Sequence, residues 1–258
     1  MSVQLSFGPG VMYGERVDQQ GSGIGPRQFG LMQDVDITFA FTNKDLYGQN
    51  QFPAAIARGQ GKVTGKAKLA QINVLLYSDL FFGLPVAAPG YTVSQDELVT
   101  IPTLAPFAVE VANGPSFALD LGVWLNSDGD RFNRVTTPVN PGDYSVGANG
   151  VYTFSSLAAG VAVRISYTYI TSTSIQIPIT NQAQGYTPAW QCTIFQKISP
   201  TVPGSPNVTL PWALGLAACV SNSLSFPTAQ DNWTLNSFDF SAFANASGVI
   251  GYYSAVSI

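Results

Sequence analysis

A stretch rich in glycine and lysine, residues 57–83, contains the residue types of a phosphate-binding loop. Such a loop has the pattern G-x-x-x-x-G-K-[ST], in which glycines let backbone amides surround the phosphate and the Ser/Thr hydroxyl holds Mg²⁺. Here Gly65 and Lys66 are followed by Ala67, and Gln60 stands five residues before Gly65. Because one glycine and the hydroxyl are missing, the pattern favours a glycine-rich strand whose lysines are solvated or meet acidic neighbours.

A second chemical pattern is the run of oxygen-bearing side chains at Asn126, Asp128 and Asp130. This spacing matches the opening of a calcium loop, which needs six to eight oxygen ligands and ends in a bidentate Glu at position twelve. That position is Thr137 here. An Asp-Gly pair between two strand-like runs is typical of a hairpin turn, and we predict a turn at this place.

Paired carboxylates are the third candidate chemistry. Asp96 and Glu97 are adjacent and would point to opposite faces of a strand, whereas Asp34 and Asp36 would share a face without an identified opposing partner. The chain has no His, so a Ser or Cys nucleophile would lack its usual base and a metal its commonest ligand. We therefore predict no catalytic residues, no metal site, no cofactor and no enzymatic activity.

The composition is unusually poor in charge. Charged residues make up 10% of the 258 residues, and the net charge is −4, whereas an average protein has about 25% charged residues. We expect a surface that is uncharged but polar, or one that is hidden against other subunits. The acidic balance argues against general nucleic-acid binding. Aromatic residues, at 12%, could line a sugar groove but are expected to fill a β core.

Cysteine usage and hydropathy indicate the cellular compartment in which the protein is made. Cys192 and Cys219 form no CxxC motif; a disulfide and two free buried thiols both remain open, and the second is favoured. The first residues show no basic start followed by an apolar run, and no apolar stretch is long enough to span a membrane. The sequence thus predicts a soluble protein made in cytoplasm.

The chain reads as an N-terminal arm followed by one β domain. Residues 1–30 are rich in Gly and Gln and are predicted to be an extended arm or loop, and residues 31–258 a single domain. Period-two alternation predicts strands at 35–41, 117–125 and 161–169, with a further strand at 52–66. Residues 138–154 resemble a hairpin with a corner at Asn149-Gly150, and short strand-like segments follow in 171–197, 207–220 and 233–257.

One segment has helical rather than strand periodicity. Between Lys66 and Phe81 apolar residues recur at helical spacing, and Gly83 and Pro85 would end the helix. The residues expected to pack this helix on the sheets are Leu69, Ile72, Leu76 and Leu80. The predicted fold is therefore mainly β, a sandwich or barrel with one flanking α-helix.

Three stretches of the chain resemble a known family. They are "LYGQNQFPAAIARGQGKVTGKAKLAQINVLLYSDLFFG" (46–83), "VNPGDYSVGANGVYTFSSLAAGVAVRISYTY" (139–169) and "DNWTLNSFDFSAFANASGVIGY" (231–252). Together they cover about a third of the chain and resemble tail tube (major tail) proteins of long-tailed bacteriophages. The resemblance lies in the general residue pattern rather than in strict motifs. The second stretch also resembles other phage virion proteins.

The resemblance implies a structural protein of the virion tail, assembled in the host cytoplasm. In that family six β-sandwich or barrel subunits form a ring, rings stack into a tube through long loops and terminal arms, and the genome passes through the channel. The implied partners are further copies of this chain, other tail proteins and viral DNA in transit without sequence-specific binding. A capsid decoration or head–tail connector protein is the alternative, and a glycan-binding tail module is a further one.

Four basic residues become candidates for contacts between subunits: Arg58, Lys62, Lys66 and Lys68. A channel lined with lysines would hold DNA through counterion release, so we expect these cations to meet acidic residues of an adjacent subunit instead. Reversing the charge at Lys62 and Lys66 should then abolish tube assembly while the monomer stays folded.

Overall fold

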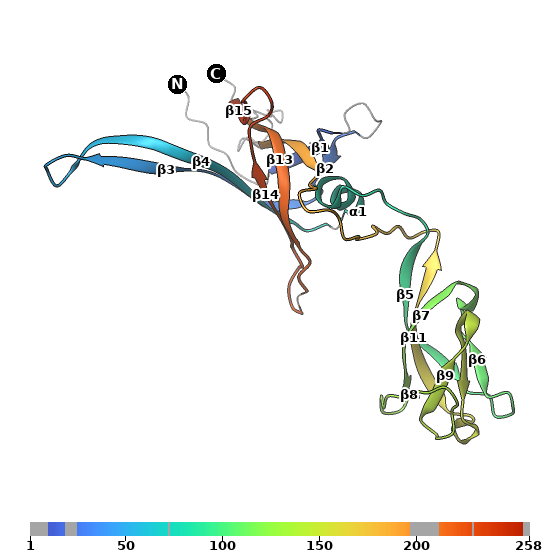
Figure 1. Cartoon of the computed structure of the whole chain (residues 1–258). Coiled ribbons are helices and arrows are strands. Elements are labelled where there is room, and N and C mark those ends of the chain that lie inside the picture. The colour runs from blue at the N-terminus through green and yellow to red at the C-terminus, as the bar shows by residue number, and fades with distance from the viewer. Residues whose placement is uncertain (1–9, 19–24, 72, 197–211, 229, 255–258) are drawn as a thin grey trace, which may run out of the picture. The chain divides into compact units, whose positions relative to one another are not determined.

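The computed structural model describes residues 10–18, 25–71, 73–196, 212–228 and 230–254 (Figure 1). The predicted mainly β fold is confirmed, since antiparallel strands make up most of the described regular structure. The chain divides into two compact units: unit 1 comprises residues 1–85 and 178–258, and unit 2 comprises residues 86–177. This division differs from the single domain expected over 31–258.

Unit 1 is built on one antiparallel sheet with the strand order β2-β1-β12-β13-β14-β4-β3, and β15 pairs with part of β13. The strands are β1 (Gly10–Arg16), β2 (Arg27–Gln28), β3 (Met32–Tyr47), β4 (Pro53–Leu69), β12 (Ala189–Gln196), β13 (Ala213–Ser225), β14 (Asn236–Ala242) and β15 (Gly251–Ser254). The strands of the first 69 residues therefore pair with those of the last 70, with unit 2 between them in the sequence.

The expected N-terminal arm is wrong for residues 10–16 and 27–28, which are strands of this sheet. β1 pairs along its whole length with β12, and Met12 and Phe29 are almost completely buried. Tertiary pairing thus orders a segment whose Gly- and Gln-rich composition suggests a loop. Residues 1–9 and 19–24 of the predicted arm lie outside the described residues.

The predicted helix over 66–81 is much shorter in the structure. Residues up to Leu69 belong to β4, because this segment is paired on one side with β14 and on the other with β3. The helix α1 spans Val74–Tyr77 and continues as a π-helical turn, Ser78–Phe82. Asn73 caps its start by accepting a hydrogen bond of 3.1 Å from the backbone N–H of Leu76, and Gly83, at φ 64°, ends it as predicted.

The four residues predicted to pack the helix on the sheets lie in different parts of the structure. Leu76 and Leu80 are buried on the helical segment, whereas Leu69 is buried as the last residue of β4. Ile72 lies outside the described residues. A Cβ added at Gly14 of β1 would come within 2.5 Å of the Leu80 side chain, so the helical turn rests on a glycine of the sheet.

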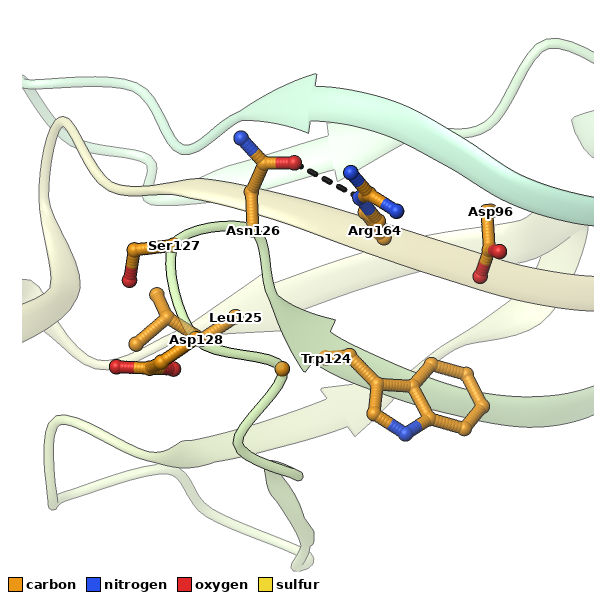
Figure 2. A pocket seen from close by; sticks show the side chains of 8 residues that line it. Asp96, Trp124, Leu125, Asn126, Ser127, Asp128 and Arg164 are labelled. Carbon is orange, nitrogen blue, oxygen red and sulfur yellow. Dashed lines mark hydrogen bonds between the residues drawn. The ribbon is translucent and has the colours of Figure 1, made fainter.

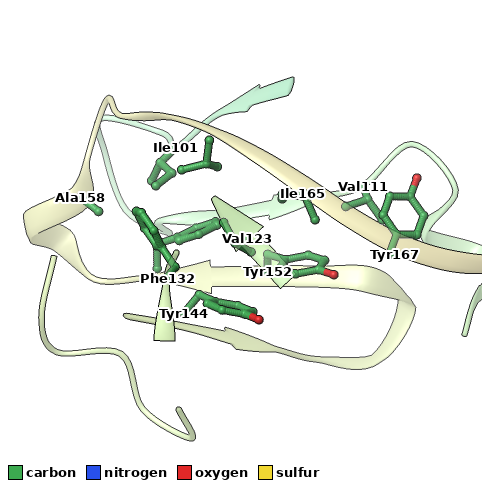
Figure 3. Packing of buried hydrophobic residues seen from close by; sticks show 11 residues of the cluster. Ile101, Val111, Val123, Phe132, Tyr144, Tyr152, Ala158, Ile165 and Tyr167 are labelled. Atoms are coloured by element: carbon green, nitrogen blue, oxygen red, sulfur yellow. The ribbon is translucent and has the colours of Figure 1, made fainter. Parts of the chain in front are cut away.

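Unit 2 is a sandwich of two small sheets. One sheet has the order β5-β11-β7 and the other β6-β10-β9-β8, with only the short β8–β9 pair parallel. The strands are β5 (Gly90–Thr100), β6 (Ala108–Glu110), β7 (Phe117–Leu125), β8 (Asn133–Arg134), β9 (Asp143–Val146), β10 (Val151–Phe154) and β11 (Ala162–Thr171). Figure 3 shows the buried cluster between the sheets, with Val123 and Ile165 from one and Tyr144 and Tyr152 from the other.

The sequence-predicted strands of unit 2 are confirmed. Residues 117–125 form β7, and residues 162–171 form β11, close to the predicted 161–169. The hairpin predicted in 138–154 is the β9–β10 pair, and Asn149 and Gly150 both have positive φ values, 57° and 63°. Two successive residues of positive φ are what the predicted corner requires.

Candidate functional site

The β3–β4 hairpin carries an apolar face that its own chain covers only in part. Val35 and Ile37 are partly buried near the rest of the sheet, but Phe39 and Phe41 further along β3 are 48% and 49% exposed. Phe39 lies opposite Val63 and Phe41 opposite Gly61. The alternation predicted for residues 35–41 is therefore present, although the described residues cover only about half of the Phe39 and Phe41 side chains.

The exposure continues to the end of the hairpin, which extends away from the other strands of unit 1 (Figure 1, blue). The pairing of β3 with β4 shifts register between Phe41 and Asn43. The guanidinium of Arg58 lies 4.3 Å from the centroid of the Phe41 ring. Other large apolar side chains exposed on the hairpin and its turn are Leu46, Tyr47, Phe52 and Ile56, at 60–80%. Two exposed aromatic rings on one face of β3, with further exposed apolar side chains toward the turn, suit an interaction with another surface.

The opposite face of the hairpin is polar and internally paired. Lys66 Nζ lies 3.9 Å from Asp239 Oδ1 of β14, and Lys68 Nζ lies 3.5 Å from Asp34 Oδ2 of β3. These acidic partners belong to the same chain. The charges of Lys66 and Lys68 therefore have partners without the expected contact to an adjacent subunit. Lys62 is exposed and has no ion-pair partner among the described residues.

The edges of the unit 1 sheet are a second element of the surface. β3 lies at one end of the strand order and the short β2 at the other. An edge strand presents backbone N–H and C=O groups that can pair with another chain. The two edges are different, which suits contact between the β3 edge of one copy and the opposite edge of the next.

The residues that resembled a phosphate loop have a structural role. Gly65 lies in the middle of β4, opposite Ile37 on one side and Phe240 on the other. A Cβ at this position would collide with the ring of Phe240, which is fully buried. Because the backbone here is a paired strand, its amides are engaged in the sheet rather than gathered around an anion.

The other residues considered for chemistry also make hydrogen bonds within the fold. The Asp128 carboxylate accepts a bond of 3.1 Å from the Asp130 N–H within the predicted turn. Glu97 accepts 2.6 Å and 2.8 Å bonds from the Tyr167 hydroxyl and the Ala112 N–H, whereas Asp96 contacts Ser166 instead. The adjacent carboxylates thus diverge as expected. Among the described residues no group of three or more acidic or Cys side chains could hold a metal ion.

Both cysteines are free and buried, the alternative that the sequence favoured. They lie on the adjacent strands β12 and β13. A hydrogen bond with Cys192 and burial together raise the pKa of the Cys219 thiol, so it stays protonated and unreactive near neutral pH.

Sequence reasoning missed two features. The exposed phenylalanines of β3 were expected to be half-buried, although the lack of large apolar residues in the facing segment 57–62 was an available signal. Trp124 was not singled out, because a lone aromatic residue in an alternating strand carries no distinctive pattern.

Comparison with protein-family models and with curated protein sequences gives no match to this chain. Within the part of the chain that the structure describes, no helix has the length and apolar character needed to cross a membrane.

Proposed function

We propose that this chain is a structural virion protein that assembles into rings, which stack as the tail tube of a long-tailed bacteriophage. The observation that carries the proposal is the β3–β4 hairpin, whose apolar face is left exposed at Phe39 and Phe41. Leaving two aromatic rings and the apolar side chains beyond them in water is unfavourable, and covering them with a second copy removes that cost.

The sheet and the composition support contact between copies. A ring formed by head-to-tail contact needs two different patches on each subunit, and the β3 and β2 edges of unit 1 differ in length and sequence. The low charge fraction, 10%, suits a chain with several interfaces, because interface centres are depleted in charged residues.

The passage of DNA rests on the resemblance to tail tube proteins. The net charge of −4 agrees with a channel that does not retain DNA, since binding by counterion release requires an excess of Lys and Arg. On this account the chain turns over no substrate, and its partners are its own copies and other tail proteins.

The proposal is tested by removing the apolar face. The double variant Phe39→Ser, Phe41→Ser should sediment as a monomer at concentrations at which the unaltered protein forms large assemblies. Neither ring is buried in the chain, so the melting temperature should change little. Analytical ultracentrifugation and circular dichroism measure the two quantities.

A matched control is the double variant Leu98→Ser, Leu119→Ser, which removes two exposed apolar side chains from unit 2, at 62% and 57% exposure. It should assemble as the unaltered protein does. Normal assembly by the phenylalanine variant, or equal loss in both variants, would contradict the assignment of assembly to the hairpin.

A further inference from the structure

Unit 2 contains a hollow of about 320 Å³ on the outer side of its three-stranded sheet. Figure 2 shows Trp124, Arg164 and Asp96 bordering it, with the turn that contains Asn126 and Asp128 at its other end. Small-molecule sites occupy about 300–1,000 Å³, so the hollow suits a small ligand or one part of a longer one.

The strands fix the indole at the surface. Val123, a neighbour of Trp124 on β7, is buried between the sheets, and period-two alternation directs Trp124 outward. Trp124 lies directly opposite Arg164 of β11. Gly122 has φ 123°, and a Cβ added there would lie 3.2 Å from Cη2 of Trp124, so the ring covers this glycine. A flat apolar surface is thus held beside a guanidinium.

The polar groups are also positioned. The Nε–H of Arg164 donates a 2.8 Å hydrogen bond to Asn126 Oδ1, which leaves its terminal N–H groups available to a ligand. Asp96 has φ 55°, a conformation rare outside glycine, and its backbone N–H donates a 3.0 Å bond to the nearly buried Ser166 hydroxyl. The bulge opposite Ser166 thereby presents the Asp96 side chain at the rim.

We propose that this hollow binds a sugar ring of an oligosaccharide. The axial C–H groups of a pyranose pack on an indole face, and its hydroxyls pair with carboxylate, amide and guanidinium groups, all of which are present. The lining does not favour an anionic ligand such as a phosphate, because it contains two carboxylates, Asp96 and Asp128, and one cation, Arg164. Arg131, which forms an isolated bridge with Trp124, is not among the lining residues. The inference does not depend on the proposed assembly, since unit 2 contributes every lining residue.

The test uses the full chain and three named probes: maltotriose, N,N′,N″-triacetylchitotriose and 3′-galactosyllactose. Isothermal titration calorimetry and saturation-transfer NMR should detect saturable binding of at least one of them. Trp124→Ala should weaken that binding by about tenfold or more through loss of the stacking surface. The matched control is Trp233→Ala, which removes an 89% exposed indole from unit 1 and should leave the affinity unchanged.

A second variant allows the proposal to be tested even if Trp124→Ala does not fold. Asp96→Gly keeps the positive φ accessible and removes only the carboxylate, so it should fold normally and still weaken binding severalfold. Circular dichroism of each variant checks the fold. Absence of binding to all three probes, or undiminished binding by the folded Trp124→Ala and Asp96→Gly variants, would overturn the proposal.

Discussion

At the scale of single residues, one close contact in unit 1 involves a glycine of the segment that resembles a phosphate loop. Gly65 faces Phe240, whose ring centroid is 5.1 Å from that of the buried Trp190. The glycine therefore allows an aromatic ring to lie directly on the strand backbone. The backbone of β4 at this point serves core packing rather than ligand binding.

Replacing Gly65 with Ala should destabilise the protein. The new methyl group would collide with the Phe240 ring, and overpacking of this kind costs about 1–3 kcal/mol of unfolding free energy. Urea unfolding followed by fluorescence measures the loss. Gly48→Ala is the control, because a Cβ there has no neighbour within 4 Å. Equal stability of the two variants would mean that Phe240 can move aside freely.

A second residue-scale feature is a buried carboxylate in unit 2. Asp120, with a side chain 4% exposed, accepts hydrogen bonds of 2.8 Å from the Tyr144 hydroxyl and 2.9 Å from the Tyr152 hydroxyl. Burial raises the pKa of both tyrosines, and the Asp120 carboxylate raises it further. Both hydroxyls must therefore remain protonated in the folded state.

Unit 2 should lose stability in alkali for this reason. A group whose pKa is raised on folding stabilises the fold fully below its unfolded pKa, here 10.0, and less as the pH rises above it. Thermal melts between pH 8 and 11 should show a falling midpoint. The double variant Tyr144→Phe, Tyr152→Phe should start lower and fall less steeply; the same slope as the unaltered protein would contradict this reasoning.

At the scale of elements, β4 changes role along its length. Its last residues pair on both sides with β14 and β3, whereas its first part forms only the exposed hairpin with β3. Lys66 belongs to the paired part and lies opposite both Asp36 and Asp239. Lys62 lies opposite Ala40 near the start of the free hairpin. The two lysines that the sequence grouped together therefore differ in what their charges contact.

Single charge reversals should separate these roles. Lys66→Glu places a third carboxylate beside Asp36 and Asp239 and should lower the melting temperature. Lys62→Glu should leave the melting temperature unchanged and reduce assembly, because its charge has no ion-pair partner among the described residues. Differential scanning fluorimetry and sedimentation measure both effects. Normal assembly by Lys62→Glu would remove Lys62 from the candidate contacts.

The sequence predicts elements well where one physical signal dominates. In 117–125 and 161–169 the period-two pattern agrees with packing of one face of each strand against the buried cluster, and both strands are present. In 66–81 apolar residues at helical spacing compete with strand pairing, and the partners β3 and β14 take the segment up to Leu69. For the candidate contacts, the in-chain partner Asp239 is 173 positions from Lys66, and no local pattern indicates such a pair.

At the scale of the whole molecule, unit 2 is an insertion between the two parts of unit 1. The chain enters it on β5 and leaves it on β11, and these strands are paired, with Gly90 opposite Thr171 and an isolated bridge between Ala87 and Gln176. Neighbouring ends of this kind let a unit be inserted without breaking the host sheet. No low-complexity linker marks the junctions, so the sequence indicated one domain.

The insertion predicts that residues 86–177 fold alone. They contain the complete buried cluster between the two sheets and both ends of the paired β5 and β11 strands. The isolated fragment should give a dispersed ¹H–¹⁵N spectrum and a cooperative thermal transition. A collapsed spectrum without such a transition would show that unit 2 requires contacts from unit 1.

A tail tube requires that the chain self-assembles, and negative-stain electron microscopy of the purified full chain at rising concentration shows whether it does. Rings and stacked tubes are expected for the unaltered protein, and they should be absent in the Phe39→Ser, Phe41→Ser variant. Single particles of monomer size at every concentration would contradict self-assembly.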